Sequence, residues 1–141
     1  MKKRQILRTY LALVDGLLPD SGTINAPIAR MEGSVITREV NFGTGESAIT
    51  HYERLAAGKE YSLAELHLET GRTHQIRVHM KYIGHPLPGD YLYNPDYRRI
   101  NRQPLHSYQL EFTHPTTGKF MLFTAPLPID LISAFYSNSL K

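Results

Sequence analysis

The chain has 141 residues, a formal net charge of +3 and no cysteine. This length is sufficient for one domain with a real hydrophobic core, and a hydrophobic content of 41% is ordinary for a globular protein. The lack of cysteine excludes a disulfide framework and a thiolate metal site. Neither a signal peptide nor an apolar stretch long enough to cross a bilayer is recognised, so we expect a cytoplasmic protein with no membrane partner.

The apolar pattern predicts an α+β fold with a mixed, mainly antiparallel sheet and a few helices. A first strand is expected over Ile6–Val14, an apolar run of β-favouring residues. The next segment, Thr23–Ile28, is short and interrupted by Pro27, which predicts an edge strand. The following run, Ser34–Phe42, alternates only moderately.

A hairpin is predicted in the middle of the chain. Its strands are Ala48–Leu55 and Tyr61–Glu69, and they are joined through the turn around Gly58. In the second strand, apolar residues alternate with polar ones up to Glu69, which is the period of a half-buried strand. Thr70-Gly71 then breaks the run.

A helix is predicted directly after this hairpin. Its apolar stripe consists of Ile76, Met80 and Ile83, which repeat at helical spacing. Thr73 is expected to be the N-cap, because its hydroxyl can accept a hydrogen bond from a free amide of the first turn. Gly84 is expected to end the helix.

The remainder of the chain predicts a loop, two strands and a last helix. The loop spans Pro86–Arg102, and alternation over Tyr108–Phe112 indicates the first strand. Phe120–Thr124 is expected to return as the second strand, and Pro128 is expected to open the terminal helix. No linker or repeat divides the chain, so residues 1–141 are expected to form a single domain.

Polar residues are dense where the predicted hairpin meets the predicted helix. The segment Leu68–Met80 contains two arginines, two histidines and a glutamine. A zinc site is not expected, because His74 and His79 are five residues apart and lie about 140° apart around a helix. The remaining alternatives are a ligand site and a basic helix start that is only solvated.

This segment resembles the signature of RNA pseudouridine synthases of the large-ribosomal-subunit (RluA) class. The similarity extends along the chain in the order of the family. The similar segments are Arg8–Val14, Gly22–Ile28, Ala48–Tyr52, Gly71–His79, Ile83–Leu87, Gly89-Asp90, Leu105-His106, Phe112–Pro115 and Ala125–Pro128.

The resemblance implies an isomerase that needs no cofactor and acts on RNA, ribosomal RNA in particular. It implies catalytic roles for Tyr10, which would stack on the uracil and transfer protons, and for Arg77, which would orient the catalytic aspartate. The residues expected to contact RNA or the base are Arg72, His74, Gln75, Lys81 and Leu105. For both Tyr10 and Leu105, simple packing in the core stays open as an alternative.

One element of the family has no counterpart in these 141 residues. The nucleophilic aspartate of the family lies in a His-Arg-Leu-Asp segment, and none of the five aspartates here matches it. The chain is therefore expected to be the C-terminal part of the catalytic domain and to be inactive alone. Arg77 is expected to lack its usual aspartate and to bind a solvent anion, a neighbouring carboxylate or a phosphate. Self-association is expected through an exposed edge at Ile6–Val14.

Two other functions remain open from the sequence. The first is a non-catalytic RNA-binding module, because Arg98, Arg99 and Arg102 lie close to tyrosines in the predicted loop and a basic segment opens the chain at Lys2. The second is a plain structural or protein-interaction domain, which would show neither RNA binding nor a polar pocket at Arg77.

Overall fold

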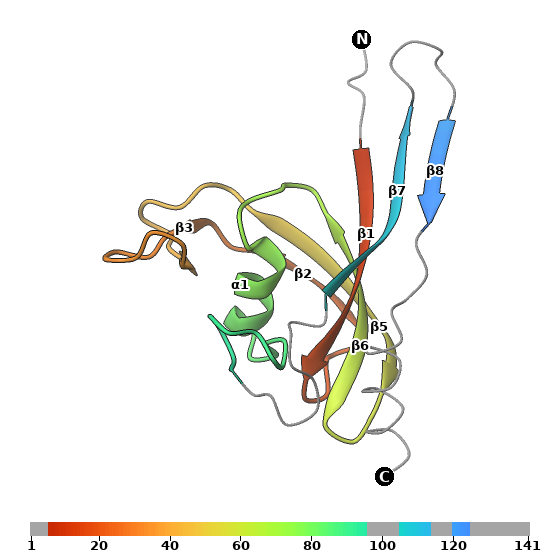
Figure 1. Cartoon of the computed structure of the whole chain (residues 1–141), viewed down its shortest axis with the longest axis horizontal. Helices are drawn as coiled ribbons and strands as arrows, with labels where there is room; N and C mark the ends of the chain where they lie inside the picture. The colour runs from red at the N-terminus through yellow and green to blue at the C-terminus, as the bar shows by residue number, and fades with distance from the viewer. Residues whose placement is uncertain (1–5, 96–104, 114–119, 125–141) are drawn as a thin grey trace.

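A computed structural model of the chain describes residues 6–95, 105–113 and 120–124 (Figure 1). Within these ranges the fold consists of antiparallel strands and a short helix. The strands are β1 (Ile6–Asp15), β2 (Ser21–Asn25), β3 (Ile28–Arg30), β4 (Arg38–Val40), β5 (Ile49–Ala57), β6 (Tyr61–Leu68), β7 (Leu105–Thr113) and β8 (Phe120–Thr124), and the helix is α1 (Gln75–Tyr82). The α+β class expected from the sequence is confirmed.

Six strands form one antiparallel sheet in the order β2-β5-β6-β1-β7-β8, and β3 and β4 form a separate pair. The expected exposed edge at Ile6–Val14 is wrong. This segment is β1, which pairs with β6 from Thr9 to Asp15 and with β7 from Ile6 to Ala12. The sequence prediction failed because the second neighbour, β7, comes from about one hundred residues further along the chain, a separation over which local patterns carry no information.

The predicted hairpin is confirmed as β5 and β6, whose register runs from Thr50 opposite Leu68 to Ala57 opposite Ser62. The short edge strand is also confirmed: β2 lies at the end of the sheet order and stops before Pro27. Of the weakly alternating run Ser34–Phe42, only β4 is a strand. Together with β3 it makes an arm that projects beside α1 (Figure 1).

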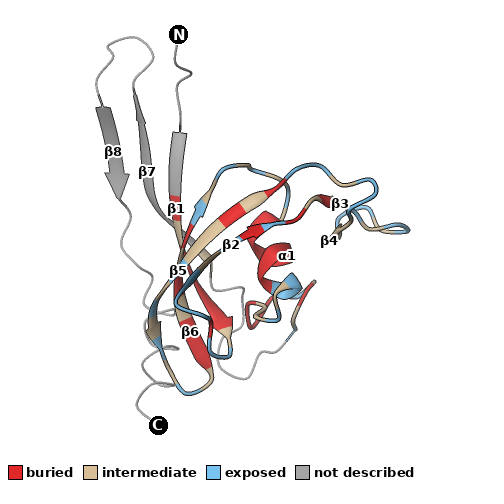
Figure 2. Ribbon diagram, turned by 180° about the vertical axis from the view of Figure 1, so that it is seen from behind, coloured by how far each residue is buried: buried red, intermediate tan, exposed pale blue. Residues whose placement is uncertain are grey.

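The core lies between α1 and the adjoining face of the sheet (Figure 2). Ile76 and Met80 of the helix pack there against residues of β1 and β6, and Ile83 packs at its margin, so the predicted apolar stripe is confirmed. The buried core residues are Ala12, Val14, Leu18, Ile24, Ala26, Ala64, Leu66, Ile76, Met80 and Leu87. Burial of this stripe anchors the helix, because an eight-residue helix is unstable by itself.

The two ends of α1 differ in how well they were predicted. Thr73 is not the N-cap: His74 occupies that position with φ 57°, and no side chain caps the helix there. Gly84 ends the helix as predicted, with φ 89°. The amide of Gly84 donates to the carbonyl of Lys81 at 3.0 Å, and the amide of His85 donates to that of Met80 at 2.8 Å. Glycine suits this left-handed position because it has no Cβ to collide with the backbone.

Some expectations fall outside the described residues. These are the terminal helix from Pro128, the basic residue Lys2, and the arginines Arg98, Arg99 and Arg102 of the loop. Within the part of the chain that the structure describes, no helix is long and apolar enough to span a membrane.

Candidate active site

A cavity of about 300 Å³ opens where the turn between β6 and α1 faces β1 and the start of β7. Its lining residues are Tyr10, Leu68, Gly71, Arg72, His74, Gln75, Ile76, Arg77 and Leu105. Six of the seven candidate residues therefore meet around one cavity. The exception is Lys81, which is exposed and whose Nζ lies 5.9 Å from the centre of the Tyr93 ring.

The sheet register explains why residues far apart in sequence meet here. Tyr10 of β1 pairs with Leu66 of β6, which delivers the chain to the turn and to α1. Leu105 pairs with Ala12, two residues along β1 from Tyr10, so the two positions present side chains on the same face. Tyr10 and Leu105 are both half-buried, in agreement with positions on a cavity wall.

Arg77 is paired with a neighbouring carboxylate, one of the three partners expected from the sequence. Its Nε donates to Oδ2 of Asp90 and its Nη2 donates to Oδ1, each at 2.7 Å. The side chain of Arg77 is 8% exposed and that of Asp90 is fully buried. The hydrogen bonds that Arg77 donates to Asp90 raise the pKa of Arg77, so the guanidinium is charged at any physiological pH.

Asp90 accepts four hydrogen bonds within the protein. In addition to Arg77, its Oδ1 accepts hydrogen bonds from the amides of Leu92 at 3.1 Å and Tyr93 at 3.3 Å. It does not line the cavity. Asp90 therefore holds Arg77 in place and closes the turn around the Asp90–Asn94 bridge, whereas Nη1 of Arg77 has no hydrogen-bond partner among the described residues.

Tyr93 contacts three basic residues at the site, Arg77, Arg38 and His74. Its ring lies 5.1 Å from Cζ of Arg77, within the range of a cation–π contact. Its hydroxyl accepts a hydrogen bond from the amide of Arg38 at 2.9 Å and lies 2.8 Å from Nδ1 of His74. The hydroxyl of Tyr93 therefore links the backbone of Arg38 to the ring of His74.

His74 is kept neutral and held rigidly at the cavity wall. Burial lowers its pKa, and the positive charge of Arg77 lowers it further. Its backbone is in the left-handed region, which costs a residue other than glycine about 1–2 kcal/mol and persists only where surrounding contacts impose it. The contact with Tyr93 is one such constraint.

Gln75 lines the cavity but has its amide fully engaged within the protein. Its Nε2 donates to the carbonyl of Ile49 at 3.0 Å and to Oγ1 of Thr50 at 2.9 Å. Its Oε1 accepts from the hydroxyl of Thr70 at 2.7 Å and from the amide of Arg72 at 3.0 Å. Gln75 therefore shapes the turn that presents Arg72.

The second histidine of the motif, His79, lies in the core and not at the cavity. Its Nδ1 is 2.7 Å from Oγ1 of Thr50, and its Nε2 is 2.8 Å from the carbonyl of Ala26. Burial lowers its pKa. The described residues contain no group of three or more histidine, aspartate or glutamate side chains able to hold a metal ion.

Two residues of the site were not assigned a role there from the sequence. From the sequence, Asp90 belongs to the Gly89-Asp90 pair that resembles the family, and Tyr93 is one of the tyrosines of the predicted loop. A usable signal for Asp90 was its place in the Gly89-Asp90 pair that follows the helix. No local pattern distinguishes Tyr93 from the exposed Tyr91 two residues earlier.

The sequence profile of the family described as RNA pseudouridylate synthase matches residues 1–82, more than half of the chain. The chain belongs to this family. It is 47% identical over 131 residues to an uncharacterized RNA pseudouridine synthase, YjbO, of Bacillus subtilis. It is 44% identical over 140 residues to the ribosomal large subunit pseudouridine synthase D of Nitrosomonas europaea.

Solved structures give the same result for the fold. The chain is similar to human RNA pseudouridylate synthase domain containing 1, with a TM-score of 0.74 and 30% identity over 86% of this chain. The chain spans 46% of the length of YjbO, 40% of the Nitrosomonas enzyme and 54% of the human structure. It therefore spans about half the length of the proteins it matches.

Proposed function

We propose that this chain supplies the uridine-binding part of an RNA pseudouridine synthase that acts on ribosomal RNA. The observation that carries the proposal is the convergence of Tyr10, Arg77 and Leu105 from β1, α1 and β7 on one cavity. A base stacked in RNA is inaccessible to chemistry, so the target uridine would enter this cavity flipped out of its stack. Stacking of the uracil on Tyr10 would contribute about 1–3 kcal/mol.

The reaction needs a carboxylate beside the base, and Arg77 is suited to orient one. The guanidinium uses its Nε and Nη2 for Asp90, which leaves Nη1 for a second carboxylate. That carboxylate would take part in releasing N1 of uracil from C1′ of the ribose. After the base turns, C5 bonds to C1′ and the C5 proton is lost, in a transfer for which Tyr10 is the nearest candidate.

None of the aspartates in the described residues is suited to be this nucleophile. Asp15, Asp20 and Asp90 do not line the cavity, and Asp20 pairs with Arg54 at the surface. We therefore propose that the nucleophile comes from a His-Arg-Leu-Asp segment outside these 141 residues. The chain by itself is expected to be inactive, because loss of an essential group commonly lowers a rate by several orders of magnitude.

Release of tritium tests the proposal, because C5 loses its hydrogen only when it bonds to the ribose. The substrate is a ribosomal RNA transcript labelled with tritium at C5 of uridine. The 141-residue chain and a chimera that joins it to the His-Arg-Leu-Asp half of YjbO are compared. The chimera is expected to release tritium and the chain alone is not. Substitutions Tyr10→Phe and Arg77→Lys in the chimera are each expected to lower the rate at least about 100-fold.

The results separate the possible functions. Release by the chain alone would contradict the proposed need for an outside aspartate. A folded chimera that binds RNA without releasing tritium would favour a non-catalytic RNA-binding module.

Because ribosomal RNA is the proposed partner, the proposed site of action is the cytoplasm. Residues 1–141 are proposed to fold as one unit. Whether that unit self-associates stays a prediction.

A further inference from the structure

A second and larger cavity, of about 470 Å³, adjoins the first. It lies between the β3–β4 arm and the turn before α1, and its lining residues are Ile28, Ala29, Arg30, Arg38, Thr44, Glu46, Gly71, Arg72 and Thr73. Gly71 and Arg72 line both cavities. The two cavities are therefore neighbours that share the wall formed by Gly71 and Arg72. We call the second cavity the arginine groove.

The arginine groove concentrates positive charge that the protein does not neutralise. Arg30 and Arg38 occupy directly opposite positions of the β3–β4 pair. Like charges at opposite positions of a strand pair destabilise it. The ion pairs of the described residues include none of Arg30, Arg38 and Arg72, and Glu46 is the single acidic residue in the lining.

Two of these guanidinium groups are fixed by backbone carbonyls. Nε of Arg72 donates to the carbonyl of Ser47 at 2.7 Å. Nη1 of Arg38 donates to the carbonyls of Val35 at 3.3 Å and Ile36 at 3.0 Å. Carbonyl oxygens hold the side chains without cancelling their charge, and the terminal nitrogens of Arg72 have no partner among the described residues. Such a fixed, charged fork matches an anion that accepts several hydrogen bonds.

We propose that the arginine groove binds the phosphodiester backbone of the nucleotides that flank the uridine in the first cavity. This inference rests on the proposed function, because it takes RNA as the ligand. Arg72 would contact the phosphate adjacent to the flipped base, and Arg30 and Arg38 would contact the next phosphates along the strand. Bound phosphates would also remove the repulsion between Arg30 and Arg38, so that binding stabilises the arm.

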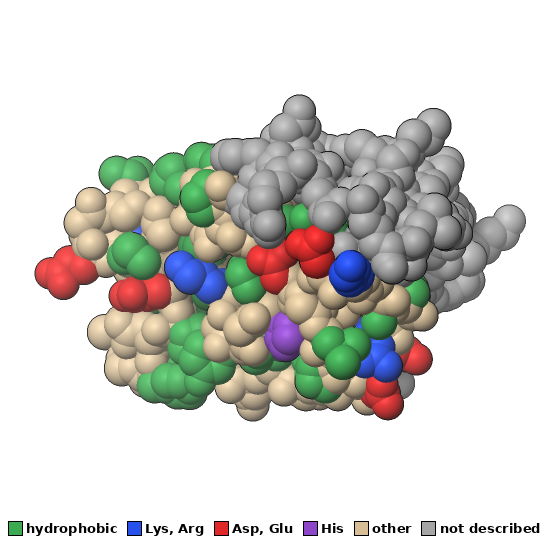
Figure 3. All heavy atoms as spheres, turned by 90° about the horizontal axis from the view of Figure 1, so that it is seen from below, with side chains coloured by type: hydrophobic (Ala, Val, Ile, Leu, Met, Phe, Trp, Pro, Cys, Tyr) green, Lys and Arg blue, Asp and Glu red, His purple; other side chains and the backbone are tan. Residues whose placement is uncertain are grey.

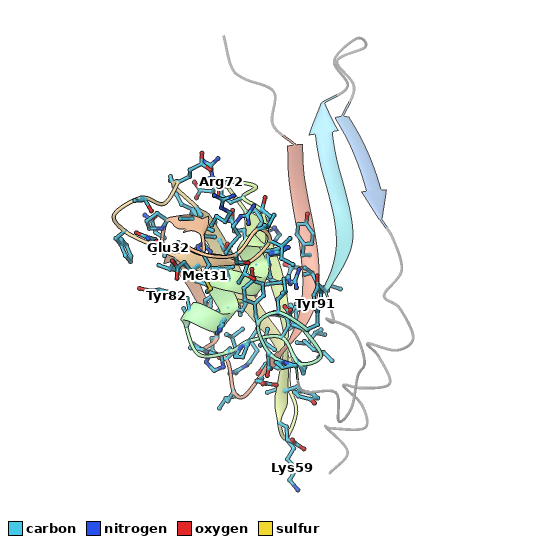
Figure 4. The ribbon with its side chains drawn as sticks, turned by 60° about the vertical axis from the view of Figure 1, so that its left-hand side comes forward. Met31, Glu32, Lys59, Arg72, Tyr82 and Tyr91 are labelled. Carbon is cyan, nitrogen blue, oxygen red and sulfur yellow. The ribbon has the colours of Figure 1, made fainter. Side chains whose placement is uncertain are left out.

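In the face seen in Figure 3, acidic and basic side chains of the described residues are both present and do not separate into patches of one sign. Lys59 lies at the end of the molecule opposite Arg72 (Figure 4). It carries the same charge as the groove arginines and is therefore a matched control for a general electrostatic effect.

The test measures how binding of RNA depends on salt. The 141-residue chain is titrated into a fluorescein-labelled single-stranded RNA of about 12 nucleotides, with one central uridine, between about 50 and 200 mM KCl. The variants are Arg30→Gln, Arg30→Gln with Arg38→Gln, and Lys59→Gln. Arg30 is exposed, so Arg30→Gln leaves the fold intact, and far-ultraviolet circular dichroism checks each variant.

The expected result follows from counterion release. Each lost phosphate contact lowers the slope of log affinity against log salt by about 0.7 for a single strand. Arg30→Gln is expected to lower it by about 0.7 and the double substitution by about 1.4, with an affinity loss of about 10-fold for the double variant at about 100 mM salt. Lys59→Gln is expected to change neither quantity.

Three outcomes would overturn the inference: no binding by the wild-type chain, an unchanged slope in both groove variants, or an equal loss in Lys59→Gln. Each is distinguishable from failure of the proposed function, which is judged by tritium release from the chimera. If the chimera releases tritium while the groove variants bind RNA normally, the proposed role of the arginine groove is contradicted and the proposed function is supported.

Discussion

Arg77 illustrates how a charged residue is kept in the interior at the edge of a cavity. A buried guanidinium is tolerated only with a compensating charge and satisfied hydrogen bonds, and Asp90 supplies both through two bonds of 2.7 Å. The rings of Tyr91 and Tyr93 lie 5.7 and 5.1 Å from its Cζ. These contacts leave the guanidinium little freedom, and a second carboxylate would therefore meet it in a defined orientation.

Substitution Asp90→Asn should strongly destabilise the chain, because it leaves the charge of Arg77 buried without a partner. The expected loss is about 3–5 kcal/mol in the free energy of unfolding, measured by urea denaturation. Asp20→Asn is the matched control: Asp20 also pairs with an arginine, but its side chain is 88% exposed. The expected loss there is below about 1 kcal/mol. Similar losses in both variants would contradict the structural role given to Asp90.

Helix α1 combines an apolar stripe with buried polar residues that each have a partner in the interior. Every residue from Gln75 to Met80 is buried, although Gln75, Arg77 and His79 are polar. Each of these three has its own partner: backbone and threonine groups for Gln75, Asp90 for Arg77, and the pair of Thr50 and Ala26 for His79. Such a network fixes the rotation of the helix, because any other rotation would bury polar groups without partners.

The buried histidine makes the stability of the helix region sensitive to pH. Burial lowers the pKa of folded His79 below its ordinary value of 6.5, so the unfolded chain takes up a proton at a higher pH than the folded chain. The free energy of unfolding should therefore decrease as the pH falls from 6.5 towards the lower pKa of the folded state, by up to about 1.4 kcal/mol per pH unit for this proton. The pKa of His74 is also lowered and adds to the same trend.

Urea denaturation at a series of pH values tests this link, with His79→Gln as the variant. Glutamine does not titrate, so the variant should show a flatter dependence of the unfolding free energy on pH below 6.5, whatever its stability at neutral pH. An identical slope in wild type and variant would show that His79 does not change its proton occupancy between the two states in this range.

The whole molecule is organised around β1. This strand lies between β6 and β7 in the six-stranded sheet, and the sheet joins the two sides of the cavity: Leu105 on β7 and the β6–α1 turn reach Tyr10 from opposite neighbours. A strand with partners on both sides has no free backbone edge for pairing with another copy. Self-association, if it occurs through strand pairing, must use another part of the chain.

Amide hydrogen exchange tests this central position. The amides of β1 between Thr9 and Ala12, where both neighbours are present, are expected to exchange among the slowest in the chain, through global unfolding alone. The amides of β2, which pairs among the described strands with β5 alone, are expected to exchange much faster through local opening. Fast exchange of the β1 amides at every protein concentration tested would contradict the six-stranded arrangement.

The sequence by itself was sufficient for features set by neighbours along the chain. The β5–β6 hairpin, the edge position of β2, the apolar stripe of α1 and its end at Gly84 all follow from side-chain periods of two or 3.6 residues and from breaker residues. The clustering of Arg72, His74 and Arg77 near one site followed from their spacing at the strand–helix junction. Thr73 is not the N-cap because His74 occupies that position in the left-handed conformation, and its contact with Tyr93 is one of the long-range constraints that hold it there.

Only the tertiary structure decided which distant residues meet. The placement of β7 beside β1 joins residues about one hundred positions apart, and the pairing of Arg77 with Asp90 depends on how the turn after the helix folds back. Local periodicity indicates which face of a helix or strand is apolar, but not which other helix or strand packs against that face. A buried charge needs a partner of opposite charge at the position where it is buried. That position is known only once the sheet and the helix are packed together.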